Sequence, residues 1–516
     1  MRTKCLASAL IVLLLPPVAS ALAEDAETAV RRPNILVLYA DDLGYGDLGC
    51  YNPASKIPTP NLDRLAAAGM RFTDGHSSSG ICTPSRYALL AGRHHWRDFH
   101  DIVNSLEPSV FKPDRLTLPE LLRAHGYATA AIGKWHLGWG WDAIRKPGAR
   151  PRAEGKRPVW GPEAFDWSRP IPDGPCAHGF DRYFGDDVIN FPPYCWIEND
   201  RVVTPPDTIL DTTSWKPIKE GDWECRPGPM VSGWDPYRNL PTTTDHGVDY
   251  IRWRKGAPSP FFLYFAFPSP HAPIIPNDAF DGASAAGAFG DFVHETDRCV
   301  GRLLDALEET GLADDTIVIF TADNGPEHYA YARDAKFGHW SSAPLRGLKR
   351  DIYEGGHRVP FIVRWPRVTA PGRVCDSLVS QIDLMATLAA AINAPLPADA
   401  AEDSHDLLPL LEGKTESVRV THIHNTFPGR YAIRHGDWLL VDAKDGYSSR
   451  RNAGWESRHG YPADDDGAAE LYDLKADLSQ KHDLAAAHPE KVAELRGLLR
   501  DIRDRGHSAP RLQAAP

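Results

Sequence analysis

Polar residues that could do chemistry follow four short apolar runs of the sequence. The apolar runs are residues 34–39, 127–132, 261–267 and 316–321. The polar groups that follow them, in the same order, are Asp41 with Asp42, Lys134 with His136, His271, and Asp323 with Asn324. Short unbroken apolar runs are typical of strands buried in a parallel sheet, and ligands of such sheets bind beyond the carboxyl ends of the strands. We therefore predict that these side chains converge on one site.

Some members of this group are candidate metal ligands with only oxygen donors. They are Asp41, Asp42, Asp323 and Asn324. Oxygen donors suit a hard cation such as Ca²⁺ better than Zn²⁺. Three carboxylates exceed the charge of one divalent ion, so an anionic substrate needs further positive charge nearby. Arg86, Lys134 and Lys349 would supply it.

A fifth element is the run Cys82-Thr83-Pro84-Ser85-Arg86, which opens a helix predicted to end near residue 90. Cys82 and Arg86 are four residues apart and therefore share a helix face. The helix N-terminus favours an anion at the same place. A chance match to the spacing C-x-P-x-R in a chain of this length is expected on the order of a few hundredths of a time. The motif is therefore a specific signal.

Taken together, the motifs resemble those of the sulfatase family. The matching runs are Ala40-Asp41-Asp42-Leu43-Gly44, Cys82 to Arg86, Gly133-Lys134-Trp135-His136-Leu137-Gly138, Pro270-His271, Thr321-Ala322-Asp323-Asn324-Gly325, and Leu345-Arg346-Gly347 with Lys349, Glu354, Gly355 and Gly356. The resemblance is strong from Pro33 to about Pro366 and looser toward the C-terminus. It implies an alkaline-phosphatase-like fold, sulfuric ester hydrolysis and one bound Ca²⁺.

The resemblance also implies that Cys82 is oxidised to formylglycine by a formylglycine-generating or sulfatase-maturing enzyme. A hydrated aldehyde has two hydroxyls: one attacks sulfur, and the other then loses its proton so that sulfate is expelled as the aldehyde re-forms. Residue 82 would join the four oxygen donors at the metal. Arg86 and His136 would hold the diol, and three further side chains would bind the sulfate oxygens. These three are Lys134, His271 and Lys349. His271 or Lys134 would protonate the leaving oxygen, and the sequence leaves this choice open.

The substrate is predicted to be a sulfated carbohydrate, because long Pro-, Trp- and Gly-rich excursions fill residues 138–260 and long loops commonly carry binding sites. Within them, His178 and Asp187 are candidate substrate contacts. Two other functions stay open: a phosphodiesterase or phosphonate monoester hydrolase of the same superfamily, and a non-catalytic carbohydrate-binding relative. The intact Cys82 and Arg86 favour an enzyme, and Lys349 with the Lys134 and His136 motif favours sulfate.

Composition sets further limits on the partners and the compartment. The chain has 516 residues and a formal net charge of -12, which argues against nucleic-acid binding through a basic surface. Residues 1–23 combine a basic start, an apolar run and an A-x-A site, which predicts a cleaved signal peptide and a secreted or periplasmic protein. No later stretch is apolar enough to predict a membrane span. Beyond the signal peptide seven cysteines remain, so at least one is unpaired or chemically special.

Strands that alternate with helices predict an α/β fold: a large mixed, mostly parallel sheet flanked by helices. Predicted helices begin after Thr59, at residue 118 and at residue 292. We place the catalytic domain at residues 24–396 and a smaller α+β subdomain at 397–516. The subdomain should hold a hairpin within 431–441 and a helix at 489–502. His405 and His424 of this subdomain are interpreted as structural.

Overall fold

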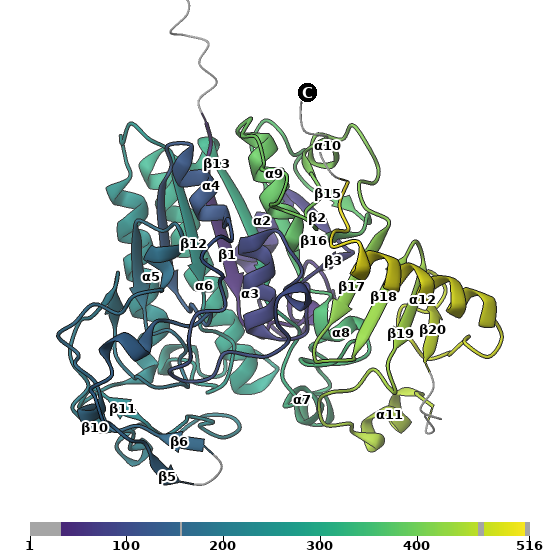
Figure 1. The fold of residues 1–516 in the computed structure, drawn as a ribbon. Helices are drawn as coiled ribbons and strands as arrows, with labels where there is room; N and C mark the ends of the chain where they lie inside the picture. The colour runs from purple at the N-terminus through teal and green to yellow at the C-terminus, as the bar shows by residue number, and fades with distance from the viewer. Residues whose placement is uncertain (1–31, 155–156, 463–468, 511–516) are drawn as a thin grey trace, which may run out of the picture.

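The computed structural model describes residues 32–154, 157–462 and 469–510 (Figure 1). The predicted signal peptide lies outside them. The fold is built on a ten-stranded sheet in the order β15-β2-β14-β13-β1-β12-β4-β7-β8-β9. Its strands are β1 (Asn34–Ala40), β2 (Met70–Phe72), β4 (Ala128–Gly133), β7 (Arg182–Gly185), β8 (Ile197–Glu198), β9 (Arg201–Val202), β12 (Phe261–Ala266), β13 (Thr316–Ala322), β14 (Phe361–Arg364) and β15 (Arg373–Cys375). The five central strands from β13 to β7 are parallel, whereas β14, β8 and β9 bring antiparallel pairings at the sides. The sheet is therefore mixed and mostly parallel, as predicted.

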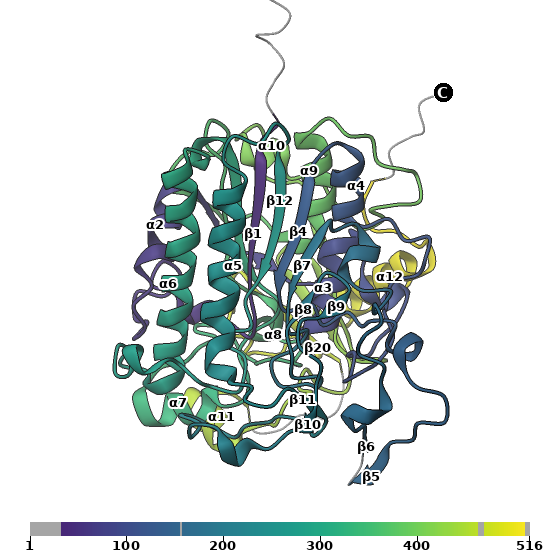
Figure 2. The same cartoon turned by 90° about the vertical axis from the view of Figure 1, so that its left-hand side faces the viewer.

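Helices cover both faces of this sheet (Figure 2). One face carries α2 (Pro60–Ala68), α5 (Asn239–Trp253) and α6 (Gly287–Thr310), and the other carries α3 (Cys82–Ala91), α4 (Leu118–Ala124) and α9 (Leu384–Ala391). Strand β1 shows why both faces are filled: Val37 packs into the core under α3, α4 and α9, and its neighbour Leu38 packs into the core under α2, α5 and α6. An unbroken apolar strand buries both of its faces in this way.

The register of the central strands places the polar groups of the site. Tyr39 of β1 pairs with Ala266 of β12, and Ala266 pairs in turn with Gly133 of β4. On the other side, Ala40 pairs with Ala322 of β13. These four strands therefore end level with one another, and the residues that follow them emerge at one edge.

A separate four-stranded antiparallel sheet forms the C-terminal part of the chain. Its strands, in order, are β17 (Thr421–Asn425), β18 (Tyr431–His435), β19 (Trp438–Asp442) and β20 (Glu470–Asp473), and α12 (Pro489–Asp504) packs on one face. The predicted hairpin and terminal helix are confirmed. The domain boundary drawn after residue 396 stays a prediction.

Short elements complete the described structure. They are the strand pairs β3 (Gly75–His76) with β16 (Val379–Ser380), β5 (Arg152–Glu154) with β6 (Arg157–Val159), and β10 (Thr208–Ile209) with β11 (Pro229–Met230), and the helices α7 (Ala330–Phe337), α8 (Glu354–His357), α10 (Leu408–Leu411) and α11 (Ala453–His459). Of the helices described here, none is both long and apolar enough to cross a membrane. All seven cysteines beyond the predicted signal peptide are free thiols.

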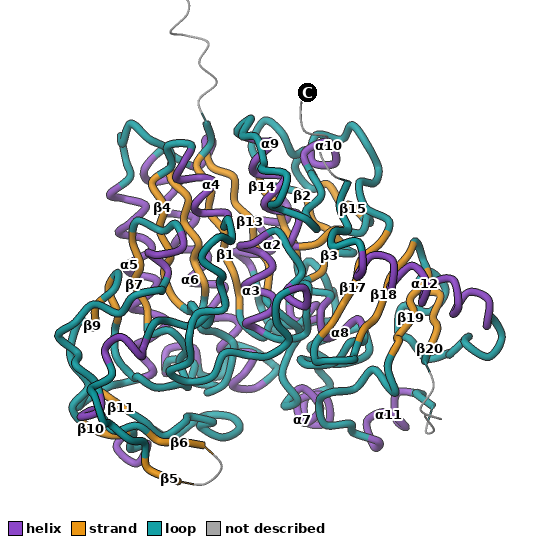
Figure 3. Tube along the Cα trace, in the orientation of Figure 1, coloured by secondary structure: helices purple, strands orange, loops and turns teal. Residues whose placement is uncertain are grey.

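The segment 138–260 differs from the prediction of long excursions alone. Loops do fill much of it (Figure 3), but β7 joins the main sheet and α5 packs beside α6. Helix α5 contains a proline, three threonines and a glycine, which are all weak helix formers. Its Gly247 lies against Phe265 and Leu303, so tightly that a Cβ atom there would lie 2.5 Å from the Phe265 ring. Tertiary packing, which sequence propensity does not show, therefore holds this helix.

Candidate active site

Cys82 is the first residue of α3 and is fully buried beyond the ends of the central strands. Its Sγ lies 3.6 Å from Oδ1 of Asp41, the first residue after β1. Burial raises the pKa of the Cys82 thiol far above its ordinary value, and the charge of Asp323 adds to the effect. The unmodified side chain is therefore a protonated thiol, and the thiolate is the nucleophilic form of cysteine.

Three buried ion pairs surround this residue. The pairs, with their shortest N–O distances, are Lys134 with Asp41 (2.6 Å), Lys349 with Asp42 (2.8 Å) and Arg86 with Asp323 (2.8 Å). All six side chains are almost inaccessible to solvent. Their charges sum to zero. A divalent cation would leave the site at +2, and a sulfate ester would then lower it to +1, so the arrangement has room for both.

The ion pairs control the protonation of the site. Burial alone would raise the pKa of Asp41, but Lys134 and then Arg86 outweigh it and hold that pKa below its ordinary value. Burial also opposes the charge on Lys134, yet Asp41 keeps the pKa of this lysine above its ordinary value. Both partners are therefore charged at neutral pH.

The four predicted oxygen ligands are brought together. The backbone N–H of Asp42 donates to Oδ1 of Asp323 over 3.2 Å, and the side-chain amide of Asn324 donates to Oδ1 of Asp42 over 2.7 Å. This leaves the buried Oδ1 of Asn324 without a partner in the described part of the chain. An unpaired carbonyl oxygen beside three carboxylates fits a hard cation. A group of ligand atoms that all lie within 4.8 Å of one another belongs to Asp41, Asp42, Cys82 and His271, so it includes one imidazole and does not include Asp323.

His136 is held as a neutral imidazole with one free nitrogen. Its Nε2 lies 3.0 Å from the carbonyl oxygen of Val103, so this nitrogen carries the proton and donates it. The buried Nδ1 has no hydrogen-bond partner among the described residues. Burial, then the charge of Lys134, holds the pKa of His136 well below its ordinary value. Nδ1 can therefore accept a hydrogen bond from a neighbouring hydroxyl.

His271 follows β12 on the more open side of the site, with 8% of its surface exposed against none for Cys82. Its Nδ1 donates to the adjacent carbonyl of Ala272, which leaves Nε2 3.8 Å from Oδ2 of Asp42. Burial and the nearby Lys349 lower the pKa of His271 to about 3.

The two predicted substrate contacts lie in different surroundings. Asp187 accepts a hydrogen bond from the backbone N–H of His136 over 3.0 Å and so helps to fix the position of His136. His178 pairs with Asp173 at 3.0 Å and packs on the ring of Trp135. Its described partners are thus outside the ion-pair cluster, and a substrate role for either residue stays a prediction.

Comparison with known proteins agrees with this geometry. A sequence model described as Sulfatase matches residues 33–394, and one described as N-sulphoglucosamine sulphohydrolase, C-terminal, matches residues 348–442. An N-acetylgalactosamine-6-O-sulfatase from Bacteroides thetaiotaomicron is 34% identical, over 92% of this chain and 94% of that protein. Human arylsulfatase A is 35% identical, over 91% of this chain and 87% of its own length.

A solved structure supports the same assignment. It is a sulfatase from a study of glycosaminoglycan metabolism by Bacteroides thetaiotaomicron, with a TM-score of 0.77, 32% identity, and coverage of 92% of this chain and 100% of that chain. The chain belongs to the sulfatase family. It is thus a sulfuric ester hydrolase with the alkaline-phosphatase-like fold that the sequence predicts.

Two charged residues beside the sulfatase site were missed by the sequence analysis. Glu327 accepts two hydrogen bonds from Arg350, each 2.7 Å long, and its Oε2 lies 3.9 Å from Nζ of Lys349. Burial would raise the pKa of Glu327, but His328 and Arg350 hold it well below its ordinary value. Glu327 therefore stays charged and helps to position Lys349. The position of this glutamate three residues after Asn324 was the available signal.

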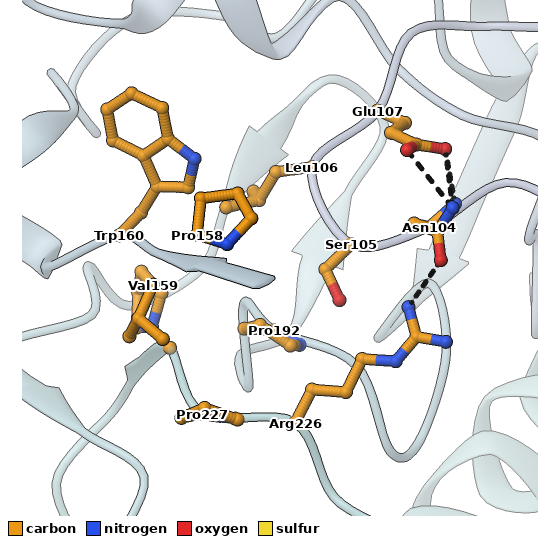
Figure 4. Close-up of a pocket in the computed structure, with 12 residues that line it drawn as sticks. Asn104, Ser105, Leu106, Glu107, Pro158, Val159, Trp160, Pro192, Arg226 and Pro227 are labelled. Carbon is orange, nitrogen blue, oxygen red and sulfur yellow. Dashed lines mark hydrogen bonds between the residues drawn. The ribbon is translucent and has the colours of Figure 1, made fainter. Parts of the chain in front are cut away.

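The sulfatase also has a pocket beside His136. Its volume is about 530 Å³, within the usual range for small-molecule sites. Figure 4 shows the Trp160 ring on one side and Arg226, hydrogen-bonded to Asn104, on the other. Arg226 stacks on the ring of Phe191, which in turn contacts the ring of His136 edge-on. The pocket is therefore linked to His136 through two side chains, Arg226 and Phe191.

The pairing of Arg86 with Asp323 predicts a loss of stability that can be measured. Arg86→Leu should lower the free energy of unfolding of the metal-free sulfatase by about 3–5 kcal/mol, because it leaves a buried carboxylate without its partner. Chemical unfolding in the presence of a chelator measures this change. The double variant Arg86→Leu/Asp323→Leu removes both charges and should recover most of the loss. A double variant no more stable than the single one would contradict the pairing.

Proposed function

We propose that this sulfatase hydrolyses a sulfate ester of a carbohydrate, with formylglycine made from Cys82 as nucleophile and with bound Ca²⁺. The observation that carries the proposal is the position of Cys82. It lies at the start of α3, 3.6 Å from Asp41, within three buried ion pairs. Formylglycine supplies a hydrated aldehyde whose first hydroxyl attacks sulfur and whose second releases sulfate.

Arg86 and His136 prepare the nucleophile. Arg86 is fixed by two hydrogen bonds to Oδ2 of Asp323, from Nε and Nη2. It is fully buried, so its charge favours an anion beside Cys82. The Nδ1 of His136 can accept a hydrogen bond from a hydroxyl, because its Nε2–H is already engaged by Val103. These contacts support the roles expected from the family resemblance.

The proposed Ca²⁺ would be held by the oxygen donors and by residue 82. The donors are Asp41, Asp42, Asp323 and Asn324. When bound, the cation stabilises negative charge on the oxygens of the sulfate group. The unpaired Oδ1 of Asn324 supports this ligand set. The absence of imidazole or thioether donors from this set favours Ca²⁺ over a softer metal.

Three side chains grip the sulfate oxygens and meet charge as it develops. They are Lys134, Lys349 and His271. Lys349 keeps its proton, because Asp42 outweighs the effect of burial and raises the lysine's pKa. Lys134 and Lys349 are charged donors that are already in place, and such donors stabilise a transition state without reorganisation. Either Lys134 or His271 then protonates the leaving oxygen. Lys134 already carries a proton to donate, whereas Nε2 of His271 must first gain one.

The carbohydrate is proposed to bind over the pocket next to His136. The relatives support this class, since one is named for N-acetylgalactosamine-6-O-sulfate hydrolysis. An aromatic ring such as Trp160 suits the apolar face of a sugar, and Asn104 with Arg226 offers polar contacts opposite it. A 6-O-sulfated N-acetylgalactosamine is the first substrate to test.

We also propose export by way of the signal peptide at residues 1–23, with conversion of Cys82 by a maturing enzyme.

The function is tested by sulfate release from a panel of sulfated monosaccharides, with a phosphate monoester as a comparison. Active preparations should hydrolyse at least one sulfated sugar and should contain the residue 82 peptide as an aldehyde. Peptide mass spectrometry detects that form. Cys82→Ala should abolish turnover with an unchanged fold, whereas Cys50→Ala should retain it. Full activity with unmodified Cys82, or preference for the phosphate ester, contradicts the proposal.

Calcium dependence is a second test. Chelation should abolish activity and added Ca²⁺ should restore it. Asn324→Ala should weaken Ca²⁺ affinity about 10-fold or more, because even supporting groups of metal sites have effects of this size. The matched control is Asn239→Ala, which removes another buried asparagine whose Oδ1 has no described partner. Calcium titration measures both variants, and equal affinities would remove Asn324 from the ligand set.

Comparison of leaving groups identifies the acid. An aryl sulfate has a stable leaving oxygen and needs little protonation, whereas an alkyl sulfate needs much more. Loss of the acid should therefore reduce kcat on the alkyl ester by about 10²-fold, with a smaller effect on the aryl ester. Steady-state kinetics of Lys134→Ala and His271→Ala on both esters will show which is the acid. Equal reductions on the two esters by both variants would exclude both residues.

A further inference from the structure

A second group of metal-ligating side chains lies where the C-terminal sheet meets the main body of the fold (Figure 1). Its members are His76 in β3, Glu354 and His357 in α8, and His424 in β17. One ligand atom from each lies within 4.8 Å of the others, and all four residues are buried. This group takes no part in the sulfatase mechanism proposed above.

The hydrogen bonds of two of these histidines fix their protons. Nε2 of His76 lies 2.7 Å from the carboxylate of Asp74, and Nε2 of His357 lies 3.2 Å from the carbonyl oxygen of Ile352. Both acceptors require an N–H, so in the neutral rings both Nδ1 atoms carry lone pairs. These two atoms face each other at 3.1 Å. Two lone pairs at this distance repel unless a cation or a proton lies between them.

The other two members have unused binding capacity. Neither ring nitrogen of His424 has a hydrogen-bond partner among the described residues, and neither does Oε1 of Glu354. Buried polar atoms are nearly always paired, because an unpaired one costs about 1–3 kcal/mol. Three unpaired atoms next to two opposed lone pairs therefore indicate that something is bound among them.

We propose that His76, His357, His424 and Glu354 bind a structural Zn²⁺ ion. Three imidazole nitrogens and one carboxylate oxygen are a donor set that suits Zn²⁺ and not Ca²⁺. Tetrahedral Zn²⁺ has Zn–N distances of about 2.0–2.1 Å, which places its ligand nitrogens roughly 3.4 Å apart. The separation of 3.1 Å between the two Nδ1 atoms is close to this spacing. Four protein ligands leave no open position, as in a structural site.

The surroundings support this site in two ways. Asp74 orients His76, which is the carboxylate–histidine–metal arrangement of many zinc sites. Arg358 contacts both Asp74 and Glu354, at 3.0 and 3.1 Å, and so fixes the carboxylates. The rings of His357 and His424 stack at 3.5 Å, so ligation requires these two rings to tilt until both lone pairs point at one ion.

The neighbouring His422 provides a matched control. Its ring lies 4.4 Å from that of His424 and is equally buried. Its Nδ1 accepts a hydrogen bond from Arg419 over 2.8 Å, so its Nε2 carries the proton and cannot bind a metal. The same substitution at the two histidines therefore separates loss of a ligand from loss of a buried ring.

Metal analysis of the untagged full-length protein tests the proposal. The protein is incubated with Zn²⁺ in the presence of Ca²⁺, and unbound Zn²⁺ is then removed by dialysis. We expect elemental mass spectrometry to find about one zinc per chain. His424→Gln should reduce zinc to less than about a tenth of that value while calcium stays bound, and His422→Gln should retain zinc. Zinc that persists in His424→Gln lies elsewhere, for example at the oxygen site, and overturns the proposal.

A measurement on the wild type covers the case in which the variant fails to fold. Co²⁺ in place of Zn²⁺ should give the visible absorption of a tetrahedral site, and anomalous scattering at the zinc edge should locate the ion among the four side chains. A protein that takes up no zinc and no cobalt at this place overturns the proposal, because a shared proton must then separate His76 from His357.

Discussion

The structure depends on pairing three carboxylates with three cations in a site that water hardly reaches. Burying even one unpaired charge costs several kcal/mol, and only close partners with good geometry repay it. Asp41, Asp42 and Asp323 each have such a partner at 2.6 to 2.8 Å. The partners come from distant parts of the chain, so the site forms only when the sheet and the surrounding loops are all in place. The stability of the protein and its catalysis therefore both require that the complete fold brings these charges together.

The level ends of the central strands position some of the residues of the site, and unusual backbone conformations position others. Asp42, His136 and Asp187 all have positive φ, at 62°, 56° and 64°. Left-handed backbone is unfavourable for residues with a Cβ atom and is concentrated at functional sites. Asp42 lies in a bend just after β1, and His136 is the third residue after β4. The side chain of Asp187 accepts a hydrogen bond from the backbone N–H of His136 and so helps to hold this conformation.

Much of this arrangement could be predicted from the sequence, because its signals are local. Unbroken apolar runs revealed β1, β4, β12 and β13, and the polar residues after them converge as expected. Features that depend on contacts between distant residues could not be predicted. Helix α5 is held by contacts with α6 and β12, although its own helix propensity is weak. Glu327 can support Lys349 only because the fold brings together the two loops that carry these residues.

The cluster of His76, His357 and His424 is another feature that the sequence does not predict. The sequence favours a structural role for His424, and nothing near it in the sequence indicates that His76 and His357 share its surroundings. The structure also connects this cluster to the catalytic site along one short segment. His76 is six residues before Cys82, and the backbone between them is tied to both sides: Ser77 N–H donates to the carbonyl of His357, and Gly80 O accepts from Arg350 N–H. A nucleophile must be held to within a fraction of an ångström. A closed metal site at the start of this segment, as proposed above, would fix its position without placing a second cation beside the substrate.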